Sequence, residues 1–232
     1  MPAFASVTLG REYCAAGGYM PRHRHRAGYV CLVLAGGYEE AGDQGRFQVR
    51  AGDAVFHGPF DAHLDRFCGT GAQTLNFEIA GWQADGWEHV RVPDPDFIAR
   101  IAERDPAEAR EALLASAAPL ANACRDWPDE LARGIRRDPD ISLGDWARDH
   151  GLAPATLSRG FRRVFEITPS AFRAQTRARR AWRAILRGRQ ALCAVSSAYG
   201  FADQAHMTRS VLRLTGATPG QWRAGRSNAF KT

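Results

Sequence analysis

The sequence predicts a two-domain α+β protein, with a β-rich N-terminal half followed by an all-helical C-terminal half. From Phe4 to about Gly81 the apolar residues form short runs separated by turn residues, which is typical of a small barrel or sandwich. After Asp94 they recur at three- and four-residue spacing, which indicates helices. Residues 1–127 hold 12 basic and 17 acidic residues, a net charge of −5, whereas residues 128–232 hold 19 and 8, a net charge of +11. This asymmetry predicts that only the C-terminal half binds a polyanion.

The composition of the chain is that of a soluble globular protein. Of its 232 residues, 45% are hydrophobic and 24% are charged. No apolar run approaches the length of a membrane span, and the first residues lack a basic region followed by a hydrophobic core. The cysteines have no paired spacing, so we expect reduced thiols in a cytoplasmic protein, with a redox sensor as the alternative. They are Cys14, Cys31, Cys68, Cys124 and Cys193.

The order of the elements suggests where the domains end. Strands are predicted at residues 29–34, 54–57 and 74–80, and the segment AGDQGR at 41–46 predicts a hairpin loop. Asp105 and Pro106 indicate the N-cap and the first residue of a helix. We expect a β-rich domain at 1–93, a helical linker or dimerisation segment at 94–127, a helical domain at 128–225, and a disordered tail at 226–232.

Histidines in the β-rich half occur at a recognisable spacing. The pattern Gly17-x5-His23-x-His25-x3-Tyr29-x6-Gly36 resembles the first motif of the cupin family, with Tyr29 in place of the usual metal-binding Glu. Residues 52–63, which end at His63, resemble a degraded second cupin motif. The resemblance implies a β-barrel or jelly roll that acts as a sensor domain.

The same histidines suit a divalent transition metal ion. His23 and His25, two residues apart on a strand, point to the same side, and His63 on a second strand can face them. Three imidazoles with one open position fit Zn, Fe, Ni or Cu. The alternative is that the histidines are vestigial and, together with Tyr29 and His57, line a pocket for an organic effector.

The most specific stretch of the chain is VSSAYGFADQAHMTRSVLRLTGATPGQWR at residues 195–223. Gly200 supplies a tight turn, and Asp203 supplies an N-cap for the helix that follows. The apolar stripe of this helix consists of Met207, Val211 and Leu214. Its opposite face consists of Ala205, His206, Arg209 and Arg213, which suits a helix that reads the major groove. An ordinary amphipathic helix with a solvated basic face is the alternative.

The same arrangement occurs about 50 residues earlier. Ser142 and Asp145 resemble a capping box, and Gly151 makes the turn before a helix that begins at Pro154. The inner stripe of this helix is Leu157, Phe161, Val164 and Phe165, and its outer face is Ala155, Arg159, Arg162 and Arg163. Two such helix-turn-helix units are harder to explain as coincidence than one.

Together these motifs resemble the DNA-binding domain of the AraC/XylS family of transcription regulators, over roughly residues 128–223. The matching segments are Leu157-Ser158-Arg159-Gly160-Phe161, Thr168-Pro169, Gly200-Phe201 and Thr218-Pro219-Gly220-Gln221-Trp222-Arg223. The resemblance implies two helix-turn-helix units joined by one long helix, from Pro169 to about Arg187, with both recognition helices on the same face of DNA. The departures are Ala153 in place of a Ser cap, Met207 and Val211 in place of Phe residues, and Ser196 in place of Ala.

The predicted function is sequence-specific transcription regulation, modulated by a small molecule or a metal at the cupin-like domain. Arg159 and Arg209 are expected to read base edges, and Arg162, Arg163 and Arg213 to hold phosphates. Their expected neighbours in the groove are Ala155, Ser158, Gln204, Ala205 and His206. The expected partners are double-stranded DNA and the effector, and the resemblance also allows RNA polymerase, as for an activator, and a homodimer. No catalytic residue is assigned, and the alternative is a metal-dependent cupin enzyme, an oxygenase or isomerase, fused to a DNA-binding domain.

Overall fold

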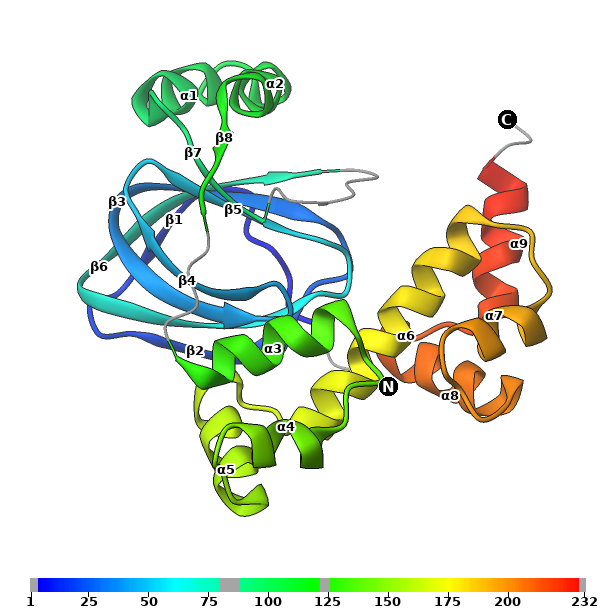
Figure 1. Ribbon diagram of the computed structural model, residues 1–232. Helices are drawn as coiled ribbons and strands as arrows, with labels where there is room; N and C mark the ends of the chain where they lie inside the picture. Colours follow the sequence, from blue (N-terminus) through cyan, green and yellow to red (C-terminus); the bar gives the residue numbers. More distant parts are fainter. Residues whose placement is uncertain (1–3, 80–87, 122–125, 230–232) are drawn as a thin grey trace. The chain divides into compact units, whose positions relative to one another are not determined.

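The computed structural model describes residues 4–79, 88–121 and 126–229, with side chains up to residue 225. The chain divides into two compact units, Phe4–Asp126 and the segment from Trp127 onward (Figure 1). The first unit is a β-sheet with two helices and the second is all helical, which confirms the α+β class. The segment 94–127, expected as a helical linker or dimerisation segment, groups with the first unit up to Asp126.

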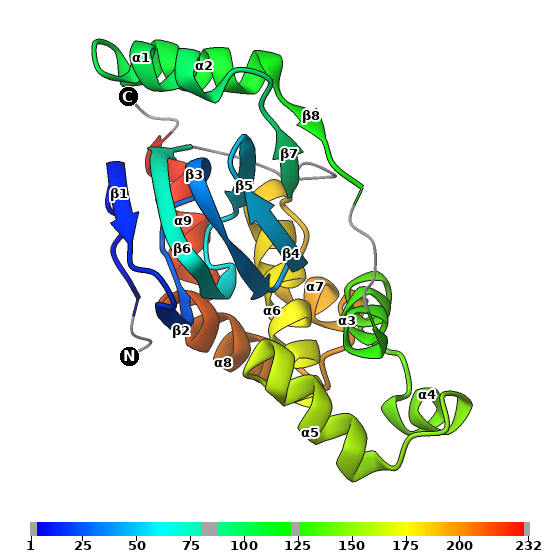
Figure 2. The ribbon, with the colours of Figure 1, turned by 90° about the vertical axis from the view of Figure 1, so that its left-hand side faces the viewer.

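The first unit contains an antiparallel sheet whose eight described strands follow the order β1-β6-β3-β5-β7-β8, with β2 on β6 and β4 on β3. The strands are β1 (Gly10–Cys14), β2 (Tyr19–Arg24), β3 (Tyr29–Gly42), β4 (Gly45–Arg50), β5 (Asp53–His57), β6 (Ala62–Glu78), β7 (His89–Arg91) and β8 (Ala118–Pro119). The first part of β3 pairs with β5 and its second part with β4, while β6 pairs with nearly all of β3. The sheet therefore curls on itself (Figure 1, Figure 2).

The hairpin between β3 and β4 is tighter than the sequence predicted. Gly42 pairs with Gly45, so that only Asp43 and Gln44 form the turn where a loop over residues 41–46 was expected. The carboxylate of Asp43 accepts a hydrogen bond from the backbone N–H of Ala62, at 2.7 Å. It also forms an ion pair with the guanidinium group of Arg22. These partners link the turn to β2 and to the start of β6.

Two glycines allow the long strands to bend. The register between β3 and β6 shifts on either side of Gly36, which has a φ of +71°. A Cβ on Gly36 would lie 2.0 Å from the carbonyl oxygen of Gly71, and a Cβ on Gly71 would lie 2.3 Å from that of Cys14. Glycine is therefore required at both positions, because any side chain would force the strands apart.

The outer face of the sheet forms one hydrophobic core with α1 (Pro95–Ala102) and α2 (Pro106–Ser116). Alternate residues of β3, Val30 and Leu32, pack there with Phe56 of β5 and with helical residues such as Ile98 and Leu113. Both views place the two helices side by side next to β7 and β8 (Figure 1, Figure 2). The apolar residues of these helices cover the sheet. A dimer contact by this segment therefore stays a prediction.

The inner face of the sheet forms a second cluster. It is made by the residues of β3 that alternate with the outer set, together with side chains from β4 and β5, and includes Tyr29, Cys31, Val33, Tyr38, Phe47, Val49 and Val55. The continuous apolar run at 29–34 is explained by this arrangement, because β3 is buried on both faces. Within the described residues the thiols of Cys14, Cys31, Cys68 and Cys193 are free, and Cys124 lies outside them.

The second unit consists of seven helices within the described residues. They are α3 (Trp127–Arg137), α4 (Leu143–Asp149), α5 (Pro154–Phe165), α6 (Pro169–Arg187), α7 (Leu192–Ala198), α8 (Gln204–Thr215) and α9 (Pro219–Ala229). The backbone of α9 remains helical to Ala229, which corrects the tail expected from residue 226, and residues 230–232 lie outside the described residues. None of the described helices is long and apolar enough to cross a membrane.

The long helix α6 supplies the centre of this unit. Near its start Phe172 packs against Phe161 and Phe165 of α5, with ring centroids 5.4 and 5.8 Å away. Near its end Trp182 packs against Trp222 of α9 at 5.6 Å. The predicted connector from Pro169 to Arg187 is thus confirmed, and its two ends belong to different helix-turn-helix units.

Candidate nucleic-acid interface and histidine site

The outer face of α5 carries the predicted contact residues. Its inner residues Leu157, Phe161 and Phe165 are buried, and Val164 is half-buried. Ala155, Arg159, Arg162 and Arg163 are exposed, and Ser158 is half-buried. The structure therefore brings the predicted residues of the first helix-turn-helix pair together on one solvent-facing side of α5.

The outer face of α8 is built in the same way. Met207, Val211 and Leu214 are at most 2% exposed, as the stripe predicted. The residues expected to face DNA are all exposed: Gln204, Ala205, His206, Arg209 and Arg213. Leu212, which the sequence did not single out, is also 40% exposed on this helix.

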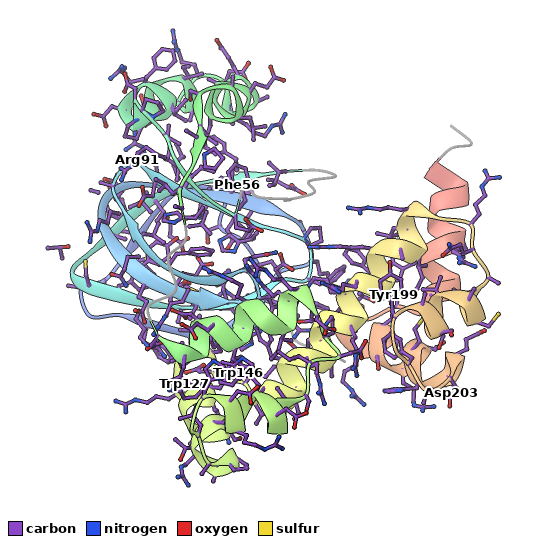
Figure 3. The ribbon with its side chains drawn as sticks, in the orientation of Figure 1. Phe56, Arg91, Trp127, Trp146, Tyr199 and Asp203 are labelled. Carbon is purple, nitrogen blue, oxygen red and sulfur yellow. The ribbon has the colours of Figure 1, made fainter. Side chains whose placement is uncertain are left out.

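Each outer helix follows a short helix and a glycine with positive φ. Gly151 precedes α5 with a φ of +64°, and Gly200 precedes α8 with a φ of +70°. Asp203 caps α8 by accepting a hydrogen bond from the N–H of His206 at 2.6 Å, whereas Ala153 provides no side-chain cap for α5. Tyr199 and Asp203 bracket the turn between α7 and α8, and Trp127 and Trp146 lie close together at α3 and α4 (Figure 3).

Three arginines of α6 hold the chain that leads into α4. Arg173 donates to the carbonyl of Ile141 at 3.2 Å, and Arg177 donates to the carbonyl of Pro139 at 2.9 Å. Arg177 also pairs with Asp140, and Arg180 donates to the carbonyls of Arg136 and Arg137. These guanidinium groups fix the first helix-turn-helix unit on the connector, a role that the sequence alone did not indicate.

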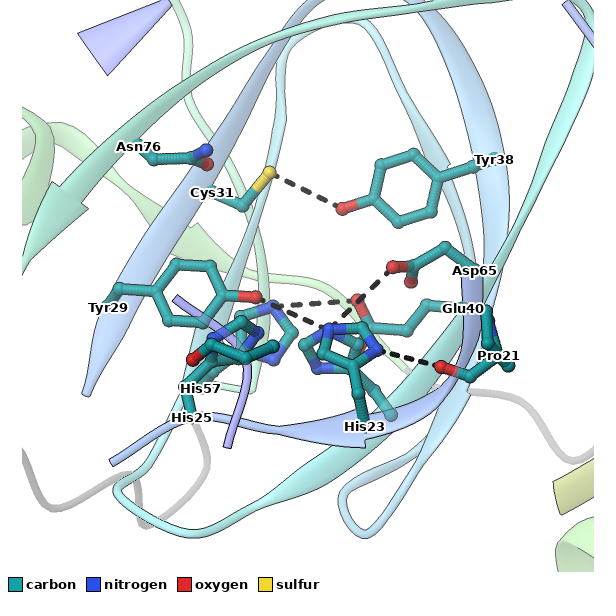
Figure 4. Close-up of polar contacts among 12 residues, drawn as sticks. Pro21, His23, His25, Tyr29, Cys31, Tyr38, Glu40, His57, Asp65 and Asn76 are labelled. Atoms are coloured by element: carbon teal, nitrogen blue, oxygen red, sulfur yellow. Dashed lines mark hydrogen bonds and ion pairs between the residues drawn. The ribbon is translucent and has the colours of Figure 1, made fainter. Parts of the chain in front are cut away.

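The first unit encloses a small cavity of about 80 Å³ that the histidines line. The sheet register builds it from cross-strand pairs that share one face, because His23 lies opposite His63, Tyr29 opposite His57, and Glu40 opposite Asp65. His25 follows β2 directly and lines the same cavity. The labelled side chains converge from several strands (Figure 4).

The three histidines predicted as metal ligands do come together. The ring centroids of His23 and His63 are 4.3 Å apart, those of His23 and His25 are 4.8 Å apart, and those of His25 and His63 are 5.5 Å apart. One potential ligand atom of each lies within 4.8 Å of the other two. A single ion can therefore reach all three after small side-chain adjustments.

Hydrogen bonds fix the orientation of two of these rings. The Nδ1 atom of His23 lies 2.9 Å from the carbonyl oxygen of Pro21, and that of His25 lies 3.0 Å from the carbonyl of Ala5. Because a carbonyl only accepts, each Nδ1 carries the proton and each Nε2 keeps a lone pair. Among the described residues, His25 Nε2 and His63 Nδ1 are buried without a hydrogen-bond partner. The donor set thus fits a metal ion, although Tyr29 replaces the usual carboxylate.

Residues 146–225, which begin within α4 and end within α9, match a family model described as a helix-turn-helix domain. This stretch is a helix-turn-helix domain. The match does not extend to the first unit, whose resemblance to cupins stays a prediction. The sequence has no significant match among curated proteins.

Several solved structures resemble the chain at low similarity. The C-terminal domain of the response regulator AraT from Geobacillus stearothermophilus is 19% identical, covers 43% of this chain and 84% of its own, and has a TM-score of 0.40. An AraC-type regulator from Chromobacterium violaceum is 22% identical, with coverages of 42% and 89% and a TM-score of 0.39. ToxT from Vibrio cholerae, with an unsaturated fatty acid bound, is 7% identical, with coverages of 93% and 94% and a TM-score of 0.41. Similarity at this level carries no information on effector or operator.

Two buried carboxylates, Glu40 and Asp65, lie beside the histidines and were not predicted from the sequence. Glu40 Oε2 lies 3.5 Å from His57 Nε2, and Asp65 Oδ2 lies 3.7 Å from His63 Nε2. The alternation of side chains along a strand could have predicted their position. Glu40 is two residues from the inward-facing Tyr38, and Asp65 is two residues from His63, so each pair shares a face. The aromatic ring of Tyr29 stacks on His57 at 4.4 Å, and its hydroxyl lies 3.3 Å from His63 Nε2.

Burial controls the ionisation of these groups. It lowers the pKa of His25 to about 4, with a further contribution from the nearby His23, and it lowers the pKa values of His57 and His63 well below the ordinary range. Burial also raises the pKa of Asp65 to about 7, assisted by Glu12, and raises that of Glu40 well above its usual value. The imidazoles are therefore neutral at pH 7, which is the form that binds metals.

Proposed function

We propose that this protein is a sequence-specific DNA-binding transcription regulator whose DNA affinity is set by a ligand bound in its N-terminal unit. The observation that supports it is the pair of exposed, arginine-bearing helices α5 and α8 on the two ends of α6. The 19 residues of α6 span about 28 Å at 1.5 Å per residue. That length is comparable to the roughly 34 Å of one DNA turn, which separates successive major-groove sites.

The roles of the exposed arginines differ in this proposal. Arg159 and Arg209 read base edges, and Ala155, Ser158, Gln204, Ala205 and His206 lie beside them in the groove. Arg162, Arg163 and Arg213 hold phosphates, which fixes the orientation of the domain without reading sequence. Guanidinium groups suit both tasks because they donate in a planar fork that matches guanine and phosphate oxygens.

A matched pair of substitutions on α8 tests this division. Arg209→Ala should cost about 1–3 kcal/mol on the preferred sequence and relax the preference at one base position. Arg213→Ala should weaken binding to all sequences alike. It should also reduce the slope of log affinity against log salt concentration by about 1. Selection of binding sites from random DNA, followed by anisotropy titrations at several salt concentrations, measures both effects. Arg100→Ala, an exposed change on α1, serves as the control.

Equal losses for Arg209→Ala and Arg213→Ala on preferred and on random DNA would contradict the division of roles. Wild-type affinity for both variants would contradict the proposed DNA-binding face itself. Both residues are exposed on the same helix, so neither change should disturb the core made by Met207, Val211 and Leu214.

The effector in this proposal is a divalent transition metal or a small organic molecule at the histidine cavity. A metal in this cavity would supply charge and fixed coordination geometry; the two candidate ligand sets are the predicted His23, His25 and His63, and Glu40, His57 and His63. The ligand must favour one arrangement of the protein by the free energy that it transmits to DNA binding. DNA affinity measured after chelation and after addition of Zn²⁺ or Co²⁺ tests the metal, and no change in wild type would exclude it as the effector.

A further inference from the structure

A second set of ligand-bearing side chains lies beside the three predicted histidines. It consists of Glu40 on β3, His57 on β5 and His63 on β6, all of them buried, and one potential ligand atom of each lies within 4.8 Å of the others. Only His63 belongs to both sets.

We propose that a divalent transition metal ion binds at Glu40, His57 and His63, in preference to the three-histidine set. This inference rests on the proposed function in treating the N-terminal unit as the sensor, and it names the ion position within that unit. His23 and His25 then lie beside the occupied position and remain open to the cavity.

The ligand atoms of Glu40 and His57 are separated by the distance expected between two ligands of one tetrahedral ion. Ligand atoms about 2.1 Å from a tetrahedral ion are separated from one another by roughly 3.4 Å. Glu40 Oε2 and His57 Nε2 are 3.5 Å apart, so an ion can bind both with little movement. The side chains of Glu40, His57 and Tyr29 converge on the same region of the cavity (Figure 4).

The charge of Glu40 favours this position over the alternative. Three neutral imidazoles would leave the full charge of a divalent ion inside a buried cavity, where uncompensated charge is costly. Glu40 loses its proton to solvent when the ion binds, and the resulting carboxylate ligand removes part of that charge. Asp65, which lies 3.7 Å from His63 Nε2, compensates further from outside the coordination shell.

An ion here would also bind two buried polar atoms that have no hydrogen-bond partner. Among the described residues, Glu40 Oε2 and His63 Nδ1 are buried and have no hydrogen-bond partner. The Nε2 atom of His63 already faces the Tyr29 hydroxyl at 3.3 Å and Asp65 at 3.7 Å, which leaves its Nδ1 as the ligand atom. Tyr29 also stacks on His57, so that one side chain helps to orient two of the three ligands.

Cobalt titration of the chelator-treated full chain tests the position of the ion. Co²⁺ affinity and stoichiometry are measured by calorimetry and by visible absorption, without DNA. Glu40→Gln and His57→Gln should lower the affinity by on the order of 100-fold, since loss of even an outer partner costs 10–100-fold. His23→Gln should retain the wild-type affinity to within about threefold, because it lies outside the proposed set.

Glu39→Gln is the matched control, because it removes the same charge from the neighbouring residue of β3 but pairs with Arg66 outside the cavity. It should bind Co²⁺ as wild type does. Wild-type affinity in Glu40→Gln, or loss of binding in His23→Gln alone, would overturn the proposal, and so would a wild type that binds no Co²⁺.

Thermal denaturation separates loss of the ion from loss of the fold. Without metal, Glu40→Gln should be about as stable as wild type, because burial already favours the neutral carboxyl group and the amide has nearly the same shape. With Co²⁺ the wild type should gain stability and Glu40→Gln should not, since an ion bound to the folded state raises its stability. DNA binding of the metal-free chain is measured separately, so that failure of the ion site and failure of the proposed regulator function give different results.

Discussion

His25 shows how the burial of one residue creates a pH dependence. Its pKa falls from 6.5 to about 4 in the folded protein. Below pH 6.5 the unfolded chain therefore binds a proton that the folded chain does not, and stability is lost as the pH falls from about 6.5 to about 4. Asp65, whose pKa rises to about 7, acts in the opposite direction because its folded form takes up a proton first. The dependence of the wild-type unfolding free energy on pH is thus a sum of opposing contributions.

A His25→Gln variant isolates the histidine contribution. In chelator-treated protein, its loss of unfolding free energy between pH 6.5 and pH 4 should be smaller than that of wild type. Each unit of pKa shift corresponds to about 1.4 kcal/mol, which solvent access to the cavity reduces, so we expect a difference of roughly 1–2 kcal/mol. Urea denaturation at a series of pH values measures it. Parallel profiles for the two proteins would show that His25 does not titrate with folding.

Elements set by local periodicity could be predicted from the sequence, and those set by strand register could not. The stripes of α5 and α8, the turn glycines and the length of α6 depend on residues within a few positions of one another. Glu40 reaches the histidines only because β3 and β6 change register around Gly36, which is a non-local property. Arg173, Arg177 and Arg180 likewise donate to backbone carbonyls that lie more than 30 residues away along the chain, so these contacts are also non-local.

The two outer helices differ at their N-termini, and this difference predicts opposite effects of substitution. The backbone of Ala153 is already extended, with a φ of −67° and a ψ of 145°, but its side chain cannot accept a hydrogen bond. Ala153→Ser should therefore stabilise the helical unit by about 0.5–1 kcal/mol, whereas Asp203→Ala should destabilise it by about 1 kcal/mol. Chemical denaturation followed by helical circular dichroism measures both changes. An unchanged midpoint in Ala153→Ser would show that solvent already satisfies the start of α5.

At the scale of the whole molecule, the two units have separate hydrophobic cores and opposite charge. Residues 1–127 carry a net charge of −5 and residues 128–232 carry +11. The core of the first unit is formed by its sheet with α1 and α2, and that of the second by side chains around α6. Units built in this way are expected to fold independently. The sequence placed the boundary at 127/128, and the structure places it one residue earlier.

This separation predicts that the salt dependence of DNA binding resides in the second unit. If Arg162, Arg163 and Arg213 each neutralise one phosphate, they should contribute a slope of about −3 in log affinity against log salt. A fragment spanning residues 127–232 should fold and reproduce the slope of the full chain to within about 1, because the acidic first unit offers DNA no net attraction. Anisotropy titrations of both proteins between 50 and 300 mM KCl, roughly the range where counterion release dominates, measure the two slopes. A fragment slope shallower by more than about 1 would show that the first unit also contacts phosphates, and would shift part of the interface to residues outside the helix-turn-helix domain.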